Sequence, residues 1–433
     1  MRGIRFHLPT AAVLFLVTLL LMTTPLPAQA QTFKVLHTFR GPDGGLPEGV
    51  LVLDKAGNIY GTASAGGSGK CGSPFIFGCG TGFMLSKAGQ EVGQVNFGLS
   101  KGFGPRAGLV RDVEGNFYGT TFLGGDTTCY QYGCGTVYKV SKTGRQTALY
   151  EFKGPPDGDE PESLLVEDTE GNLYGTTYTG GAYQDAGTVF EIDGAGNETI
   201  LYNFCSQANC TDGQFPDPGV IRDGSGNLYG VASAGGDFGA GVVYELDTSG
   251  KETVLYSFTG GSDGDGPYST LLRDSQGNLY GTTQGGGILT GPCSGQGAEG
   301  CGVVFEVSLQ PGGTWKETTL YRFCSLTNCA DGETPLSGPL VRDVSGNLYG
   351  TTTRGGSFQG GICHIDGCGV VFELDTAGKE TVLHTFTGGT DGANPWAGLT
   401  ADGHGNLYGT AQAGADTQCF PPDGCGVVFK ISR

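Results

Sequence analysis

The chain has 433 residues, of which 83 are glycine and only 15% are charged, and its formal net charge at pH 7 is -19. This charge excludes nucleic acid and anionic membrane surfaces as expected partners, because both repel an acidic protein. It favours solubility or, alternatively, the attraction of cations or basic partners. After the N-terminal segment, no stretch shows the i, i+3, i+4, i+7 apolar spacing of a helix. The composition therefore predicts an all-β protein.

Residues 1–30 have the pattern of a secretory signal peptide. Two arginines are followed by an apolar run from Ala11 to Met22 and by a small-x-small cleavage site, Ala-Gln-Ala, that ends at Ala30. Threonines and prolines interrupt or end this run, which is too short for the roughly 20 apolar residues of a membrane anchor. We therefore expect residues 31–433 to form a secreted or periplasmic protein, monomeric and not inserted in a membrane.

Near-copies of one phrase, Asp-x-x-Gly-Asn-Leu-Tyr-Gly-Thr-Thr, recur along the rest of the chain. A period of this size indicates one supersecondary unit, repeated so that each unit buries its apolar faces against its neighbours. The repeat runs almost from end to end, so we expect a single domain over residues 31–433. Consecutive copies are 51 to 69 residues apart, beginning at Asp54, Asp112, Asp168, Asp223, Asp274, Asp343 and Asp402.

The unit is clearest between Ser163 and Phe204, where four strand-like segments are separated by two short turns and one longer loop. In each Asp-x-x-Gly turn, the Asp side chain accepts free backbone amides and the Gly takes the positive φ that closes a hairpin. The glycine inside the second strand, such as Gly175, lets a neighbour approach closely. Apolar residues occupy both strand faces, so each sheet must be covered on both sides. Four-stranded antiparallel meanders stacked in this way predict a β-propeller.

The two ends of the repeat give the number of blades. Residues Phe33–Phe39 match the fourth strand of the unit before any first strand has appeared, and Gly426–Ile431 form a third strand with no fourth after it. The N-terminal segment therefore supplies the strand that the last blade lacks, which leaves the ring no open edge. We predict a seven-bladed β-propeller closed by its N-terminal strand. The longest step contains insertions at residues 285–300 and 309–316, which we expect to be loops.

The fourteen cysteines fall into seven local pairs, and in an exported chain this spacing predicts seven small disulfide loops rather than a zinc site. All pairs fall in the loops between strands two and three or just after strand four. We call this end of the ring the stapled rim. Its loops are either pre-organised for binding or merely stiffened against proteolysis. The pairs are Cys71 with Cys79, Cys129 with Cys134, Cys205 with Cys210, Cys293 with Cys301, Cys324 with Cys329, Cys363 with Cys368, and Cys419 with Cys425.

The crossing from each blade to the next repeats as Asp-Gly-x-x-Pro on the stapled rim. The simplest interpretation is that the Asp caps its turn and the Pro opens the inner strand, where no ladder donor is needed. The alternative is an acidic ring at the channel mouth that binds a cation or polar ligand, although hard cations require several oxygens in one place. The aspartates are Asp43, Asp157, Asp212, Asp263, Asp331 and Asp391, and the seventh copy has Lys101.

Aromatic residues also mark this rim, among them Tyr130, Tyr132 and Trp396. Flat rings beside acidic and amide groups suit carbohydrates; alternatively, such rings fold over a disulfide as a local core. Signals for catalysis are weak, because the copies are nearly equivalent and histidine is scarce. The one irregular cluster, residues 363–366 with Arg354 nearby, is either an acid/base site or, as we prefer, an ordinary polar loop tip. We predict no metal, cofactor or catalytic residue.

The phrases Asp-x-x-Gly-Asn-Leu-Tyr-Gly-Thr-Thr, Gly-Val-Val-Phe-Glu-Leu-Asp and Thr-Val-Leu-Tyr-Ser-Phe resemble the tandem repeat of the choice-of-anchor GloVer-repeat (Gloeo/Verruco repeat) proteins of bacteria. The resemblance covers essentially everything after the leader and implies a bacterial exported repeat protein, without a settled activity. Members often end in a sorting anchor, which we do not expect here because the residues Lys430–Arg433 carry no sorting signal. The Asp-x-x-Gly-Asn-x-Tyr turn is also similar to repeats of sensor-type and lactonase-like propellers, an analogy of fold only.

Taken together, these patterns predict an exported binding module that holds a carbohydrate or protein ligand through the stapled rim, without catalysis. The alternatives are a glycan-active hydrolase or lyase with its site at the channel mouth, and a purely structural surface protein. The candidate binding residues are Asp43, Lys101, Asp157, Asp212, Asp263, Asp331, Asp391, Trp396, Tyr130 and Tyr132.

Overall fold

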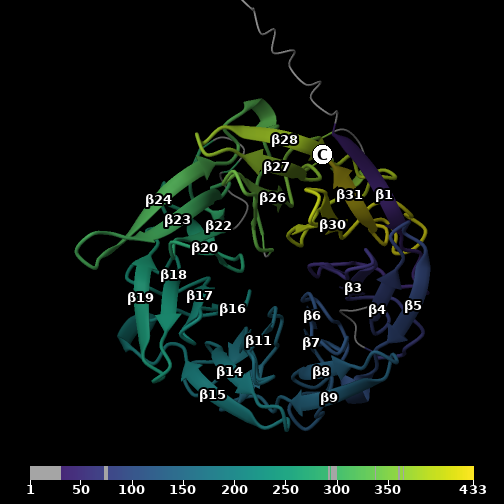
Figure 1. Ribbon diagram of the computed structural model, residues 1–433, viewed down its shortest axis with the longest axis horizontal. Coiled ribbons are helices and arrows are strands. Elements are labelled where there is room, and N and C mark those ends of the chain that lie inside the picture. The colour runs from purple at the N-terminus through teal and green to yellow at the C-terminus, as the bar shows by residue number, and fades with distance from the viewer. Residues whose placement is uncertain are drawn as a thin grey trace, which may run out of the picture.

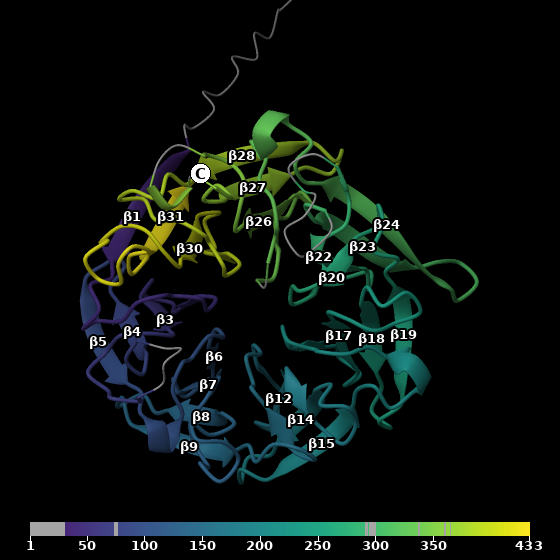
Figure 2. The same ribbon diagram turned by 180° about the vertical axis from the view of Figure 1, so that it is seen from behind.

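The structure, a computed structural model, shows seven antiparallel four-stranded blades arranged radially around a central axis (Figures 1 and 2). The predicted all-β, seven-bladed propeller is confirmed. The predicted signal peptide, residues 1–30, lies outside the described part of the chain. The described residues are 31–72, 77–290, 293, 300–336, 338–358, 361–363 and 365–433.

Each blade is a meander whose first strand lies next to the axis and whose fourth lies outermost (Figure 1). Blades one and two contain β2 (Val52–Leu53), β3 (Ile59–Ala63), β4 (Thr81–Leu85), β5 (Glu91–Asn96), and β6 (Val110–Arg111), β7 (Phe117–Thr121), β8 (Thr136–Val140), β9 (Gln146–Glu151). Blades three and four contain β11 (Val166–Glu167), β12 (Leu173–Thr177), β14 (Thr188–Ile192), β15 (Glu198–Asn203), and β16 (Val220–Arg222), β17 (Leu228–Ala232), β18 (Val242–Leu246), β19 (Glu252–Ser257). Blades five and six contain β21 (Leu272–Arg273), β22 (Leu279–Gly285), β23 (Val303–Leu309), β24 (Trp315–Arg322), and β25 (Val341–Arg342), β26 (Leu348–Thr352), β27 (Val370–Leu374), β28 (Glu380–Thr385). Blade seven contains β29 (Thr400–Ala401), β30 (Leu407–Ala411), β31 (Val427–Ser432) and β1 (Thr32–Thr38).

Short elements supplement the blades. β20 (Asp265–Pro267) pairs with β22, and β10 (Gly158–Asp159) pairs with β13 (Thr179–Gly180). Within the described ranges, the helical elements are 3-10 turns: η1 (Leu99–Lys101), η2 (Ala208–Cys210), η4 (Thr327–Cys329) and η5 (Gly361–Cys363).

Blade seven joins the two ends of the repeat. β1 pairs antiparallel with β31, with Phe33 opposite Ile431 and Thr38 opposite Val427. The next residue, Phe39, packs edge-to-face on Phe83 of blade one, with 5.1 Å between ring centroids. The same edge-to-face contact joins the other neighbouring blades, for example Phe258 and Phe305 at 5.1 Å. The junction between blades seven and one is therefore packed like the others, and closure by the N-terminal strand is confirmed.

The core is divided into seven clusters of buried residues, one between each pair of neighbouring blades. Each cluster includes the aromatic ring of a third strand, which lies over the glycine of the adjacent second strand. A Cβ at Gly61 would lie 2.5 Å from the ring of Phe83, so no side chain fits there. The repeated glycine is thus required by the packing of each blade.

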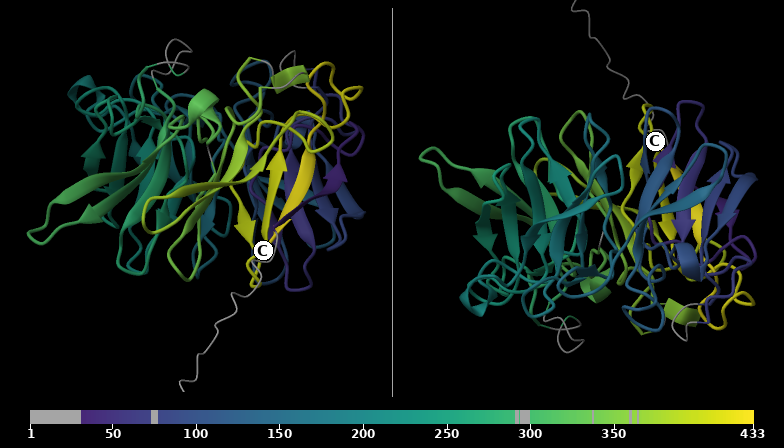
Figure 3. Two further views of the ribbon diagram at one scale, coloured as in Figure 1. Left: turned by 90° about the horizontal axis from the view of Figure 1, so that it is seen from above. Right: turned by 90° about the horizontal axis from the view of Figure 1, so that it is seen from below.

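The short turns lie at one end of the ring, and the longer loops between second and third strands gather at the other (Figure 3). In the first turn, Asp54 Oδ1 accepts the amides of Ala56 and Asn58 at 2.9 Å, and Gly57 has a φ of 84°. The capping mechanism predicted for the Asp-x-x-Gly turns is confirmed. One expectation was wrong: residues 309–316 do not form a plain loop. Leu309 pairs with Trp315, because the insertion extends the β23–β24 hairpin and turns at its two glycines.

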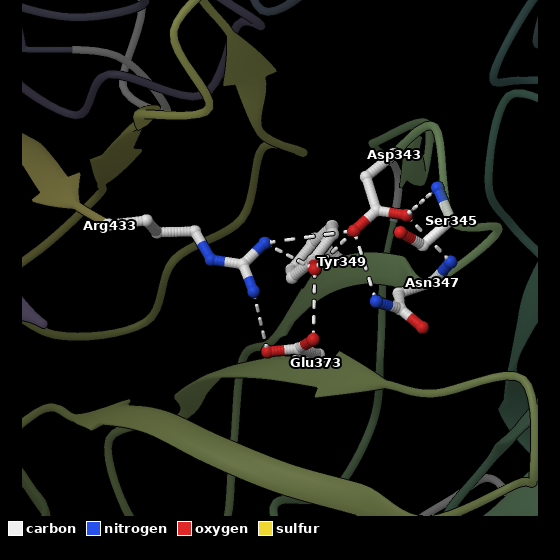
Figure 4. A network of polar contacts seen from close by, with 6 residues as sticks. All are labelled: Asp343, Ser345, Asn347, Tyr349, Glu373 and Arg433. Atoms are coloured by element: carbon white, nitrogen blue, oxygen red, sulfur yellow. Dashed lines mark hydrogen bonds and ion pairs between the residues drawn. The ribbon is translucent and has the colours of Figure 1, made fainter. Parts of the chain in front are cut away.

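At the end of the ring that carries the short turns, Arg433 joins blades six and seven (Figure 4). Its guanidinium lies 3.0 Å from Glu373 Oε2 and also bonds the hydroxyl of Tyr349, which lies 2.9 Å from the capping Asp343. In other blades, the residue before the capping Asp is often an arginine whose guanidinium lies over the corresponding tyrosine of the preceding blade, as Arg222 lies over Tyr174. Blade seven has Ala401 at that position. Arg433 therefore takes over the contact from a different strand.

Candidate functional site

The six predicted aspartates each cap a crossing beside an outer strand. Asp212 Oδ2 accepts the Tyr202 hydroxyl and the Ser206 amide, both at 2.8 Å. Asp391 accepts the Thr387 amide at 3.0 Å and lies 3.2 Å from the His384 ring nitrogen. The remaining four are held in the same way, with partners in the crossing and on the outer strand: Asp43, Asp157, Asp263 and Asp331.

These aspartates therefore lie one per crossing, and none lines the central cavity described below. Lys101, in the seventh crossing, lies 3.4 Å from the Gln146 carbonyl. The geometry is that of turn caps, and a binding role for these residues stays a prediction.

The three predicted aromatic residues lie in different surroundings. Tyr132 packs against a buried cluster that contains the Cys71–Cys79 disulfide, as expected of a local core. Tyr130 is exposed at the tip of its loop. Trp396 is half-buried and lines two adjoining cavities, one at the axis and one on the stapled rim. Of the three, only Trp396 belongs to the site described next.

All seven predicted disulfides are formed, and they hold the loops of the stapled rim against the ends of the blades. Each joins the two cysteines that the sequence spacing paired. The bonds are Cys71–Cys79, Cys129–Cys134, Cys205–Cys210, Cys293–Cys301, Cys324–Cys329, Cys363–Cys368 and Cys419–Cys425.

Two of these cysteines, Cys368 and Cys425, are more deeply buried than their position in surface loops suggests. Cys368 and Cys425 are both 0% exposed, and neither lines the two cavities described below. Cys368 belongs to the buried cluster that contains Phe386, and Cys425 belongs to the cluster that contains Phe39. Because each directly precedes a glycine that leads into a third strand, its sulfur is carried into the space between two blades. These two cysteines therefore extend the core and are not binding residues.

Two of the disulfides, Cys293–Cys301 and Cys324–Cys329, bring four sulfur atoms within 4.8 Å of one another. Each sulfur is already bonded to another. This group therefore presents no thiolate to a metal.

A cavity of about 260 Å³ lies on the axis and is lined by residues from the inner segments of all seven blades. Its charged side chains occupy one position of the repeat, directly after the crossing proline. The residues at this post-proline position are Glu48, Arg106, Glu162, Asp217, Tyr268, Leu336 and Trp396. All except Tyr268 and Leu336 line the axial cavity itself.

The backbone turns these residues toward the axis. The residue before each proline has a positive φ, including 61° at Phe215 and 54° at Thr334, values that non-glycine residues rarely adopt. In four of the seven blades, a threonine of the second strand then bonds the inner segment of the next blade, as Thr120 does with the Ser163 carbonyl at 3.1 Å. Thr176 does the same with the carbonyl of Asp217 at 3.3 Å. The inner segments are thus held by repeated contacts, while the post-proline side chains differ.

Arg106 is the centre of the charged group. Its guanidinium bonds Glu162, its Nε lies 3.8 Å from Glu48 Oε2, and its Cζ lies 3.9 Å from the centroid of the Phe122 ring. Gln412 donates its side-chain amide to Glu48. One cation therefore bridges two carboxylates from the blades on either side.

Asp217 is bound on one side only. The residue is 4% exposed and lies near the hydroxyl of Tyr268, but its Oδ1 is buried without a hydrogen-bond partner among the described residues. A buried acceptor without a donor costs about 1–3 kcal/mol. The cavity thus holds an oxygen that a bound donor would satisfy.

Burial raises the pKa of all three carboxyls in this cavity. Desolvation, followed by the charge of Asp217, raises the pKa of Glu162 to about 8. Desolvation raises the pKa of Asp217 to about 6 and also raises that of Glu48, against the opposing effect of Arg106. Three carboxylates and one guanidinium leave a net charge of -2 when all are ionised (three negative, one positive). The cavity is therefore deficient in positive charge.

A second cavity of about 740 Å³ opens on the stapled rim and shares Trp396 and Gln412 with the axial cavity. Its wall includes Arg354, whose Nε lies 3.9 Å from Asp366 Oδ2. Desolvation raises the pKa of the neighbouring Glu333 to about 6. Of the irregular cluster predicted from sequence, Arg354 and Asp366 thus line this rim cavity, Cys363 and Ile365 do not, and His364 lies outside the described residues.

The charged residues of the axial cavity, Glu48, Arg106, Glu162 and Asp217, are not among the predicted site residues. A signal for them exists in the sequence. The prolines recur in all seven crossings, whereas the next residue changes from copy to copy. Variation at one position inside a fixed repeat marks a side chain that the shared framework does not need.

Together, the fold and the site define a disulfide-stapled β-propeller with a charged cavity on its axis. Residues 75–291 and 286–433 match the profile of the Gloeobacter/Verrucomicrobia repeat. The chain belongs to this family, which confirms the resemblance seen in its repeated phrases.

Among the solved structures similar to this chain, one supports the fold and nothing beyond it. The extracellular domain of a protein assigned as a one-component system from B. thetaiotaomicron is 14% identical, with a TM-score of 0.51 over 93% of this chain and 41% of that one. A protein assigned as a 6-phosphogluconolactonase from Bacteroides fragilis is also 14% identical, with a TM-score of 0.47 over 87% and 100% of the two chains. A gluconolactonase from Xanthomonas campestris is 13% identical, with a TM-score of 0.40 over 73% and 82%. No curated protein matches the chain. None of the helical segments in the described ranges has the length and apolarity to cross a bilayer.

Proposed function

We propose that this protein is an exported binding module that holds a carbohydrate at the stapled rim, with its recognition centre in the axial cavity. The observation that carries the proposal is the convergence of five post-proline side chains on that one cavity. Repeated packing holds their backbone, so the group is pre-organised for a ligand. Disulfide-rich repeats of this kind are typical of proteins outside the cytoplasm, in the medium or the periplasm.

The stapled loops enlarge the contact surface around the cavity. In six blades, the loop between strands two and three carries one exposed apolar residue, and in blade seven Phe420 stacks on one of them, Phe77, at 5.2 Å. Apolar groups on a rigid rim support binding of an extended ligand or, alternatively, of another surface protein. The exposed residues are Phe77, Tyr130, Tyr183, Phe238, Leu289 and Ile365.

The chain contains two tryptophans, which allows a matched test. Trp396 lines both cavities, whereas Trp315 lies in the β23–β24 hairpin and lines neither. Calorimetric titration of residues 31–433 with soluble polysaccharides should detect binding that Trp396→Ala weakens at least about tenfold, or 1.4 kcal/mol. Trp315→Ala should retain the affinity. Binding to no polysaccharide, or equal loss in both variants, would contradict the proposal.

One observation favours the alternative of a glycan-active hydrolase or lyase. Glu162 and Asp217 line one cavity with raised pKa values, a property of many acid–base pairs. An enzyme of this kind would release reducing ends or unsaturated products from the bound glycan, and Glu162→Gln would abolish that release. A binding module would leave the glycan intact in both forms.

A further inference from the structure

We propose that the axial cavity recognises a primary ammonium group carried on a sugar ring, so that the preferred ligand is an amino-sugar oligosaccharide. This inference rests on the proposed function, because it assigns a ligand class to the same site. Three features of the cavity carry it: its charge, the unsatisfied oxygen of Asp217 and the arrangement of side chains around the axis.

The net negative charge of the cavity favours a positively charged ligand group. Arg106 already bridges Glu48 and Glu162, yet the group keeps a net negative charge: -2 when all four side chains are ionised, and -1 when Glu162, whose pKa is raised to about 8, is protonated. Asp217 contributes the charge that Arg106 does not bond directly, and its Oδ1 has no partner among the described residues. A ligand ammonium next to this oxygen would supply both the missing donor and a positive charge.

The two halves of the post-proline ring differ in chemistry. Blades one to four contribute charged residues, and blades five to seven contribute an aromatic or apolar residue each. A ligand in the axial cavity therefore meets carboxylates on one side and the ring of Trp396 on the other, and Leu336 lines the adjoining rim cavity. An amino sugar has the matching pattern, an ammonium on one edge and a flat face of C–H groups.

The donor set favours an ammonium over a metal ion. Calcium takes 6–8 oxygen ligands, whereas two of the three carboxylates here are held by Arg106. An ammonium has three donors and can use the single open oxygen of Asp217. The rim cavity, which shares Trp396 and Gln412 with the axial one, provides room for the neighbouring sugar rings of an oligosaccharide.

The test compares two ligands that differ only in the amine. Glucosamine oligosaccharides and N-acetylglucosamine oligosaccharides of equal length are titrated into residues 31–433 by calorimetry near neutral pH. We expect the free amine to bind at least about tenfold more tightly. Asp217→Asn should remove this preference, and so should Glu48→Gln, which lowers the charge on the other side of Arg106. Asp237→Asn is the matched control, because this exposed residue of the same blade lines neither cavity.

The outcomes separate this inference from the function on which it rests. If both oligosaccharides bind equally, with loss only in Trp396→Ala, the binding module stands and the ammonium site is wrong. If neither binds, the carbohydrate ligand of the proposed function fails as well. Binding of a tri-lysine peptide in place of the amino sugar, with the same dependence on Asp217, would overturn the sugar assignment. Binding of calcium chloride alone with that dependence would overturn the ammonium assignment.

Discussion

Glu252 should make the stability of the propeller fall as the pH rises. The residue begins outer strand β19, is 9% exposed, and has an Oε1 that is buried without a partner among the described residues. Desolvation, followed by the charge of Asp212, raises the pKa of Glu252 to about 7. Because this folded-state pKa lies above the ordinary value of 4.5, ionisation favours the unfolded chain. Stability from this group is complete below about pH 4.5 and is lost as the pH rises through about 7.

The size of the effect follows from the shift. The difference between 4.5 and about 7, at 1.36 kcal/mol per pKa unit, amounts to about 3 kcal/mol. Glu252→Gln removes the ionisation, so this variant should be about 3 kcal/mol more stable than the parent at about pH 9 and equal to it at about pH 4. With an unfolding entropy of about 2.1 cal/mol/K per residue over about 400 residues, the gain corresponds to about 4 °C in Tm.

Thermal unfolding followed by circular dichroism, with the disulfides intact, measures this difference across the pH range. Glu170→Gln serves as the control, because Glu170 is exposed in a turn. This variant should melt at the same temperature as the parent protein at each pH. A gain for Glu252→Gln that is the same at low and high pH would refute the reasoning, and so would the absence of any gain at high pH.

Three further variants test packing and closure. Tyr244→Phe removes a hydroxyl that is buried without a partner among the described residues, so it should stabilise the protein by about 1–2 kcal/mol in urea titrations, and a loss of stability would contradict this. Arg433→Met should lower the free energy of unfolding by about 1 kcal/mol, and a double-mutant cycle with Glu373 isolates the contribution of this ion pair. A coupling energy of zero would show that the pair does not stabilise the fold. Phe39→Ala should cost about 3–5 kcal/mol and speed hydrogen exchange of the β1 amides, and unchanged protection of β1 would argue against its role in closure.

Most of the fold could be predicted because each repeat contains recognisable turn and strand sequences, and because the repeats pack against one another in the same way. The match of Phe33–Phe39 to a fourth strand was enough to predict ring closure. The contact of Arg433 could not be predicted, because the framework position at Ala401 lacks its usual cation and the replacement comes from the end of another strand. That Arg433 takes this structural place becomes clear only from the three-dimensional arrangement of neighbouring blades.

The candidate site was harder to predict for a related reason. The crossing aspartates repeat and are acidic, which draws attention to them, yet each is occupied in holding its own turn, as Asp212 is by Tyr202 and Ser206. The residues that meet at the axis are separated by more than fifty positions in the sequence, and no local pattern joins them. Glu48 and Glu162 become neighbours of Arg106 because the inner segments of consecutive blades lie side by side, and Gln412 of blade seven reaches Glu48 because the ring is closed.

Repetition and recognition place opposite demands on this chain. The second-strand glycines and the turn aspartates make the same kind of contact in one blade after another, the glycines with a third-strand ring and the aspartates within their own turn, so a change at one of them disturbs the framework of its blade. Five of the seven post-proline side chains instead line the axial cavity, outside the buried clusters that pack the blades together. Seven equal residues there would form a symmetric ring, whereas charged residues from four consecutive blades and a tryptophan from blade seven give the cavity a direction. An asymmetric ligand can be bound in one orientation only by a cavity of this second kind.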